Sequence, residues 1–264
     1  MYWKRRHTAL VLAFIALVAG LCALATQLGL SASNHLGLWF TVVLGVLVVA
    51  LMLVVGDGVI GRPAGILIDS RNRVSLKNFQ LVAWTLVVLT AFGGVFLTNL
   101  LAGASPVDAL NIGVPQELWA TLGVSGATFV TAKAINVDQG KKADDALPAE
   151  VYAAQKAAGE GDSEQPTVVA KGKLAVKVDK GWASWGDMFA SDFAGDAMHV
   201  DISKVQTFFF TVVLAIGYTA AVVDLLIGAT KPIGALPALN PAFVVVLAIS
   251  QGGYVGRKAA GYLG

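Results

Sequence analysis

Six segments of this chain are apolar over the length that a bilayer-spanning helix needs, roughly 17 to 25 residues. They cover residues 8–30, 36–56, 79–101, 118–134, 205–227 and 241–256. The fourth and the last are short and rich in small residues, which favours helices packed against protein, with a re-entrant or interfacial hairpin as the alternative. Since 56% of the residues are hydrophobic and only 14% are charged, the sequence predicts an all-α membrane protein with about six transmembrane helices.

The first apolar segment has two interpretations, a retained helix or a cleaved secretory signal. Three basic residues, Lys4, Arg5 and Arg6, precede it as they would in a signal, and the Ala-Leu-Ala triplet at 23–25 resembles a cleavage site. However, the apolar stretch is longer than the roughly 7 to 15 residues of a signal peptide. We therefore favour a helix that stays in the mature chain.

Basic residues set the expected orientation, because the cytoplasmic loops of membrane proteins retain Lys and Arg. With six spans and a cytoplasmic N-terminus, all of the 19 Lys and Arg residues except Lys231 lie on the cytoplasmic side. Five spans, or the opposite orientation, would lose this sorting. We therefore expect a chain in the inner membrane, in contact with the lipid bilayer, with its N- and C-termini in the cytoplasm.

One long polar stretch, at residues 136–200, interrupts the apolar pattern. Within it, residues 168–178 partly alternate between charged and apolar side chains, which predicts a strand in a short β-hairpin. Aromatic residues then recur at helical spacing from Trp182 to Phe193, which predicts an amphipathic helix, although these rings would equally pack the insert against itself or the bundle. We therefore expect two N-terminal helices (1–62), a helical hairpin (63–135), a small cytoplasmic insert (136–200) and a second helical hairpin (201–264).

The two predicted helical hairpins are similar to each other when the second is moved back by 125 or 126 residues. Both would cross the membrane in the same directions, so the repeat is parallel, related by an axis along the membrane normal. Chance similarity between apolar helices is the alternative, and matched polar residues argue against it. These matched residues are Gln80 and Gln206, Thr85 and Thr211, and Ser125 and Ser250.

The run SLKNFQLVAWTL at 75–86, followed by a GVS or AIS helix that ends in Lys-Ala, resembles a family of uncharacterised bacterial multi-pass inner-membrane proteins with duplicated helical hairpins. The resemblance covers residues 65–134 and 185–259. It implies a bacterial origin and the duplicated-hairpin architecture. It implies no activity and no catalytic residue.

The matched polar residues have two interpretations, hydrogen bonds between packed helices or the lining of a pore. Asp224 is the best candidate for an acidic residue inside the membrane; it falls near the outer end of its segment, where a structural role is favoured over ion coupling. A cytoplasmic basic cluster would bind anionic headgroups or a partner protein, or would anchor the helix ends. Its members are Arg71, Arg73, Lys133 and Lys258.

Several classes of function find no support in the sequence. The net charge of +2, with dispersed basic residues, gives no reason to expect a nucleic-acid partner. The single cysteine, Cys22, can form no intramolecular disulfide, and the three histidines lie outside the apolar segments, so no metal site or proton relay is predicted. No catalytic motif is recognisable. We therefore expect a protein that is not an enzyme and uses no cofactor.

Two functions remain. The favoured one is a membrane scaffold or anchor, with homo-oligomers as an option, that presents a cytoplasmic face to a protein partner through residues 136–204. The alternative is a channel or transporter for a small solute or ion, built on the internal repeat and lined by the matched polar residues and Asp224. The scaffold is favoured because transporters usually have interrupted helices and charges near the middle of the membrane.

Overall fold

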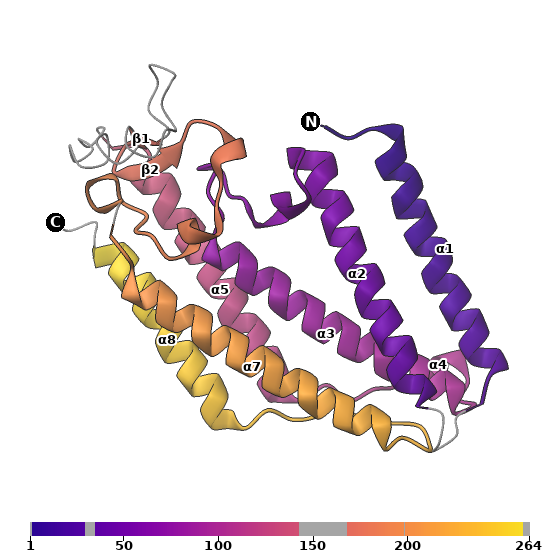
Figure 1. Cartoon of the computed structure of the whole chain (residues 1–264). Coiled ribbons are helices and arrows are strands. Elements are labelled where there is room, and N and C mark those ends of the chain that lie inside the picture. The colour runs from indigo at the N-terminus through magenta and orange to yellow at the C-terminus, as the bar shows by residue number, and fades with distance from the viewer. Residues whose placement is uncertain (1, 30–34, 143–167, 198, 261–264) are drawn as a thin grey trace. The chain divides into compact units, whose positions relative to one another are not determined.

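The computed structural model describes residues 2–29, 35–142, 168–197 and 199–260, and these are mostly helical (Figure 1). All six apolar segments form helices, as predicted. They are α1 (Arg5–Gln27), α2 (Leu36–Ile60), α3 (Leu76–Leu101), α5 (Gln116–Gln139), α7 (Ile202–Ile227) and α8 (Pro241–Ala260).

Five of these helices, all except α8, are long and apolar enough to cross a membrane. The described chain is therefore mostly helical, as predicted, and these five helices are compatible with embedding in a membrane. α8 has 20 residues, which at about 1.5 Å per residue is long enough to span, but its last turn carries Arg257 and Lys258. A sixth span at α8 therefore stays a prediction.

Shorter elements connect the long helices. α4 (Pro106–Ala109) follows α3, and its N-cap Ser105 accepts a hydrogen bond from the backbone N–H of Asp108. In the ranges that the structure describes, the remaining elements are two strands, β1 (Val168–Lys171) and β2 (Leu174–Lys177), and four 3₁₀ turns, η1 (Pro63–Leu67), η2 (Lys180–Trp182), η3 (Trp185–Met188) and η4 (Ala194–Asp196).

The first of two compact units comprises Met1–Ile66, Val82–Leu122 and Val212–Val244. Within it, α2 and α3 approach closely because glycine faces threonine: a Cβ on Gly94 would clash with the Thr41 side chain, and one on Gly37 with the Thr98 side chain. Small residues thus replace bulky ones where the two backbones meet. The apolar core beside this contact consists of Ala25, Phe40, Leu44, Val48, Leu97, Leu100, Leu101 and Ala109.

Asn99 of α3 fixes the segment that follows α7 in this first unit. Its Nδ2 donates to the Ile233 carbonyl oxygen over 3.0 Å, and the Ile233 N–H donates to its Oδ1 over 2.6 Å. Asn99 is buried, so these bonds satisfy an amide that would otherwise be costly inside the protein. The side chain therefore acts as a structural clamp.

The second compact unit comprises Leu67–Leu81, Gly123–Thr211 and Val245–Gly264. It contains the antiparallel pair β1 and β2, in which Val168 faces Lys177 and Lys171 faces Leu174. The turn between them has a positive φ of 59° at Gly172, and a Cβ there would clash with the carbonyl of Gln139 on α5. Glycine is thus required both by the turn and by the close approach to α5. The predicted β-hairpin is confirmed.

The predicted amphipathic helix between Trp182 and Phe193 is wrong. The structure forms separate 3₁₀ turns there, and Asp187 caps one of them by accepting the Ser184 N–H over 2.9 Å. Burial is also the reverse of that expected for a surface helix, because Asp192 is 4% exposed whereas Trp185 is 58% exposed. The buried carboxylates find cationic partners, and these contacts fix an irregular path for the chain.

Candidate functional site

The strongest polar site lies in the second unit, where a tight turn before α3 meets the segment between β2 and α7. The turn is closed by a bridge between Ile68 and Val74 and by the Asp69 N–H, which donates to the Arg73 carbonyl over 2.9 Å. Asn72 takes a positive φ of 56°, which Asn tolerates better than most residues. We call residues 68–75, 168–197 and 199–201 the cap.

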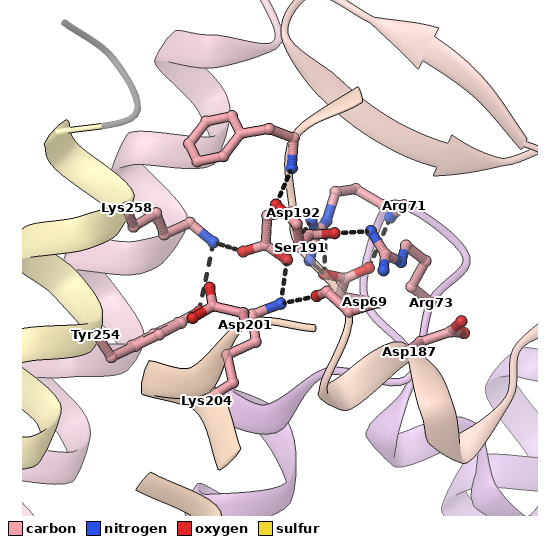
Figure 2. A network of polar contacts seen from close by, with 12 residues as sticks. Asp69, Arg71, Arg73, Asp187, Ser191, Asp192, Asp201, Lys204, Tyr254 and Lys258 are labelled. Atoms are coloured by element: carbon pink, nitrogen blue, oxygen red, sulfur yellow. Dashed lines mark hydrogen bonds and ion pairs between the residues drawn. The ribbon is translucent and has the colours of Figure 1, made fainter. Parts of the chain in front are cut away.

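Asp192 stands at the centre of this site, with three cations around its carboxylate (Figure 2). Its Oδ1 lies 2.8 Å from Arg71 Nη1 and 2.7 Å from Lys204 Nζ, and its Oδ2 accepts a hydrogen bond from Lys258 Nζ. Arg71 comes from the turn, Lys204 from the first turn of α7 and Lys258 from the last turn of α8. One carboxylate therefore connects the cap to two helices.

Further contacts hold the partners of Asp192 in place. The Arg71 guanidinium also binds the Asp69 carboxylate, with Nε at 2.9 Å and Nη2 at 2.8 Å from Oδ2. Arg73 Nη1 donates to the Ser191 carbonyl over 2.7 Å, and Lys204 Nζ donates to the Ala190 carbonyl over 2.7 Å. The two backbone carbonyls that precede Asp192 in the chain are thus both held by cationic side chains.

A further ion pair lies within the cap. Lys177 Nζ lies 2.9 Å from Asp187 Oδ1, and the Lys177 N–H donates to the Arg71 carbonyl over 2.9 Å. Asn72 Nδ2 donates to the Lys177 carbonyl over 2.8 Å. The turn before α3 and the strand β2 are therefore joined by backbone and side-chain bonds together.

Burial and charge act in opposite directions on these groups. Burial alone would raise the pKa of Asp192, but the charges of Arg71, Lys204, Lys258 and Arg73 outweigh it and hold that pKa well below its usual value. For Arg73, burial and the neighbouring Arg71 charge lower the pKa. Asp192 is therefore ionised at every physiological pH, and its charge is a permanent part of the structure.

Polar side chains of the helices pair with one another in the same unit. Gln80 Nε2 on α3 donates to Thr211 Oγ1 on α7 over 2.8 Å. Ser250 Oγ on α8 lies 2.9 Å from Thr207 Oγ1, and Gln251 Nε2 donates to Ser125 Oγ on α5 over 3.3 Å. These bonds link helices to one another.

The predicted site residues fall into distinct environments. Gln80, Ser125, Thr211 and Ser250 are buried, whereas Thr85 and Gln206 are exposed. The first four lie in helix contacts, which is the packing interpretation of the matched polar residues. Asp224 is exposed near the end of α7, and its carbonyl accepts the Gly228 N–H over 3.3 Å.

The predicted basic cluster is brought together only in part. Arg71, Arg73 and Lys258 gather around Asp192 and are buried, being 6%, 4% and 3% exposed. Only Lys133 is exposed. Arg71 and Lys258 form ion pairs with Asp192, and Arg73 binds the Ser191 carbonyl, so these three cations do not form a free basic surface.

Sequence reasoning missed two polar contacts. No sequence pattern pointed to Asp192 or Lys204 as site residues, because Asp192 lies within the polar stretch and Lys204 lies at its border. His7 was set aside as lying outside the apolar segments, yet it is 2% exposed in the first unit and its Nε2 lies 3.0 Å from Asp57 Oδ2. The Lys4 N–H donates to His7 Nδ1 over 2.8 Å, so Nε2 carries the proton that Asp57 accepts.

Comparison with protein families, with curated proteins and with solved structures finds no match to this chain. Within the described ranges, no group of three or more His, Cys, Asp or Glu side chains is placed to hold a metal ion. The site must therefore be interpreted from its own geometry.

Replacing Asp192 with Asn should destabilise the protein strongly. The amide leaves buried cations without a counter-charge, and breaking a buried ion pair in this way typically costs about 3 to 5 kcal/mol. The apparent melting temperature in mild detergent, followed by tryptophan fluorescence, should fall by many degrees. Asp196→Asn is the matched control, since Asp196 is 49% exposed; an equal fall in both variants would contradict the structural role of Asp192.

The melting temperature should also depend on acid pH through Asp192. A carboxyl group whose pKa is lower in the folded state contributes stability that is complete above its unfolded pKa of about 3.9 and is lost as the pH falls below that value. We expect the wild-type melting temperature to drop progressively as the pH falls below about 4. The drop should be smaller in Asp192→Asn, and an equal drop would show that other carboxylates cause it.

Proposed function

We propose that this protein is an integral membrane scaffold that holds the cap rigidly against its helices and presents it to a protein partner. The proposal includes no catalysis and no cofactor. The observation that carries it is the Asp192 network, in which the cap is bound to α7 through Lys204 and to α8 through Lys258. A fixed surface of this kind suits partner docking, because a rigid binding surface loses little conformational entropy on association.

The helix contacts support a scaffold over a channel. Gln80, Ser125, Thr211 and Ser250 are engaged with other helices, so they are not available as a file of ligands for a moving ion. A groove of about 420 Å³ in the first unit is lined mainly by apolar residues of α2, α3 and α7. The hydroxyls of its Thr41 and Thr219 donate to carbonyls of their own helices. Thr90 Oγ1 is the one hydroxyl of this lining without a partner among the described residues, and a single such group among apolar walls does not favour a polar solute.

The distribution of basic residues supports the orientation that we propose for this protein in the membrane. We place the cap and both termini on the cytoplasmic side of a bacterial inner membrane, with α8 as a sixth span and Lys231 outside. Lys231 is exposed in the segment between α7 and α8, as an external loop residue would be. The internal repeat of the two helical hairpins is part of the same proposal.

The cap also carries exposed apolar side chains that suit a protein contact. Trp185, Val178 and Val200 are 58%, 44% and 57% exposed. Large aromatic side chains are enriched among the residues that dominate binding energy at protein interfaces. Trp185 is therefore the residue that we expect to contribute most to partner binding.

Replacing Trp185 with Ala should remove a partner without changing the fold. We expect affinity purification from bacterial membranes in mild detergent to recover a stoichiometric partner with the wild type, and at least about tenfold less of it with Trp185→Ala, as a loss of about 1.4 kcal/mol or more would give. Quantitative mass spectrometry measures the ratio, and the melting temperature should stay unchanged.

Trp119→Ala is the matched control, because Trp119 is 60% exposed on α5 and lies outside the cap. This variant should keep the partner. Recovery of a homo-oligomer without any partner would overturn the scaffold proposal and would favour the channel alternative, which flux measurements in proteoliposomes then test. Equal loss of the partner in both variants would show that partner binding does not depend on the cap.

The proposed orientation predicts the labelling of introduced cysteines. In a Cys22→Ser background, Lys231→Cys should react with a membrane-impermeant maleimide added to intact spheroplasts, whereas Lys171→Cys should react only after permeabilisation. Both positions are exposed, so access differs only through the membrane. Reaction of Lys171→Cys in intact spheroplasts would reverse the orientation.

A further inference from the structure

A pocket of about 290 Å³ opens beside the Asp192 network, between the β-hairpin, the turn before α3 and the end of α5. Five of its lining residues are basic, namely Arg71, Lys77, Lys133, Lys141 and Lys171. No Asp or Glu belongs to its lining as far as the structure describes the chain. We call it the basic pocket. All of its lining residues belong to the second unit.

Lys77 is the least satisfied of these cations. It is only 6% exposed, and its Nζ lies 5.7 Å from the centre of the Phe129 ring, a cation–π contact. Among the described residues no carboxylate forms an ion pair with it. A buried ammonium without a direct ion pair is costly, and the charges of Asp69 and Asp192 offset this cost only in part, so an anion in the pocket would stabilise Lys77 further.

The surrounding charges increase the demand for an anion. Arg71 is occupied by Asp69 and Asp192, and the cations that contact these two carboxylates outnumber them. Lys133, Lys141 and Lys171 are exposed at the pocket, where their flexible side chains can reach a bound group. The pocket therefore has a positive potential, with one buried ammonium and three mobile ones.

Asn136 adds a second requirement for the ligand. It lines the pocket, is 9% exposed, and its buried Oδ1 has no hydrogen-bond partner in the described parts of the chain. A carboxamide oxygen accepts a hydrogen bond, so a ligand that satisfies it must carry a hydroxyl or another donor. The ligand should thus combine negative charge with an O–H group close by.

We propose that the basic pocket binds a phosphate ester whose alcohol part carries a free hydroxyl, as in a glycerol phosphate. Lysine side chains bind the phosphate oxygens through charge-assisted hydrogen bonds, and Asn136 Oδ1 accepts the hydroxyl. The same chemistry occurs in the headgroup of phosphatidylglycerol and in soluble phosphate esters. This inference goes beyond the scaffold function and does not depend on it.

Binding of two probes to the full-length protein tests the proposal. The soluble probe is glycerol 3-phosphate, measured by isothermal titration calorimetry in mild non-ionic detergent. The lipid probe is phosphatidylglycerol. The protein is placed in nanodiscs of phosphatidylcholine, either with or without phosphatidylglycerol. Native mass spectrometry then measures how much phosphatidylglycerol stays bound to the protein. The double variant Lys133→Gln/Lys171→Gln removes two exposed charges from the pocket, and Lys173→Gln removes a charge from the same β-hairpin outside the pocket lining.

We expect the double variant to weaken binding of at least one probe by about tenfold and the control to leave it within about twofold. An effect on glycerol 3-phosphate would identify a soluble ligand, and an effect on lipid retention alone would identify a headgroup site. Binding of neither probe to the wild type would overturn the proposal. Equal weakening by Lys173→Gln would also overturn it, because the interaction would then depend on net charge alone.

Discussion

The ionised carboxylate of Asp192, buried among cations from three parts of the chain, is the interaction on which the cap depends. Removing this group from water is costly, and the cost is recovered only where Arg71, Lys204 and Lys258 are all in place. The β-hairpin, the turn before α3 and the ends of two helices are therefore fixed by one shared geometric requirement. Such a requirement selects one arrangement of these segments more strongly than apolar packing does, because a buried charge that lacks part of its partners is costly.

The same principle applies to the helices, where polar groups are few and meet each other. Thr211 accepts a hydrogen bond from Gln80 and donates its own hydroxyl to the Thr207 carbonyl over 2.8 Å. In a low-dielectric environment each such pair favours one register between two helices. In the first unit, the close approach of Gly94 to Thr41 also favours one register between two helices, because a larger side chain at position 94 would clash there. The small and polar residues therefore determine how the helices pack against one another. The apolar residues, which are the majority, determine only that these segments form long apolar helices.

Composition made the helices predictable, and alternation made the β-hairpin predictable, because both are local patterns. The partners of Asp192 were not predictable, since Lys258 lies 66 residues away and Arg71 lies much farther back along the chain. The aromatic spacing from Trp182 to Phe193 misled because it suggested a periodic element where buried Asp187 and Asp192 dictate an irregular one. Burial of Arg71 and Arg73 likewise needed knowledge of carboxylates from another segment. Long-range ion pairing leaves no periodic trace in a single sequence.

The position of Lys258 in the last turn of α8 has a consequence for biosynthesis. Asp192 and Lys204 emerge from the ribosome together, but the third cation follows only after α7 and most of α8 have been made. Until then the carboxylate lacks part of its counter-charge. The ion-pair network of the cap can thus be completed only after almost the whole chain has been synthesised.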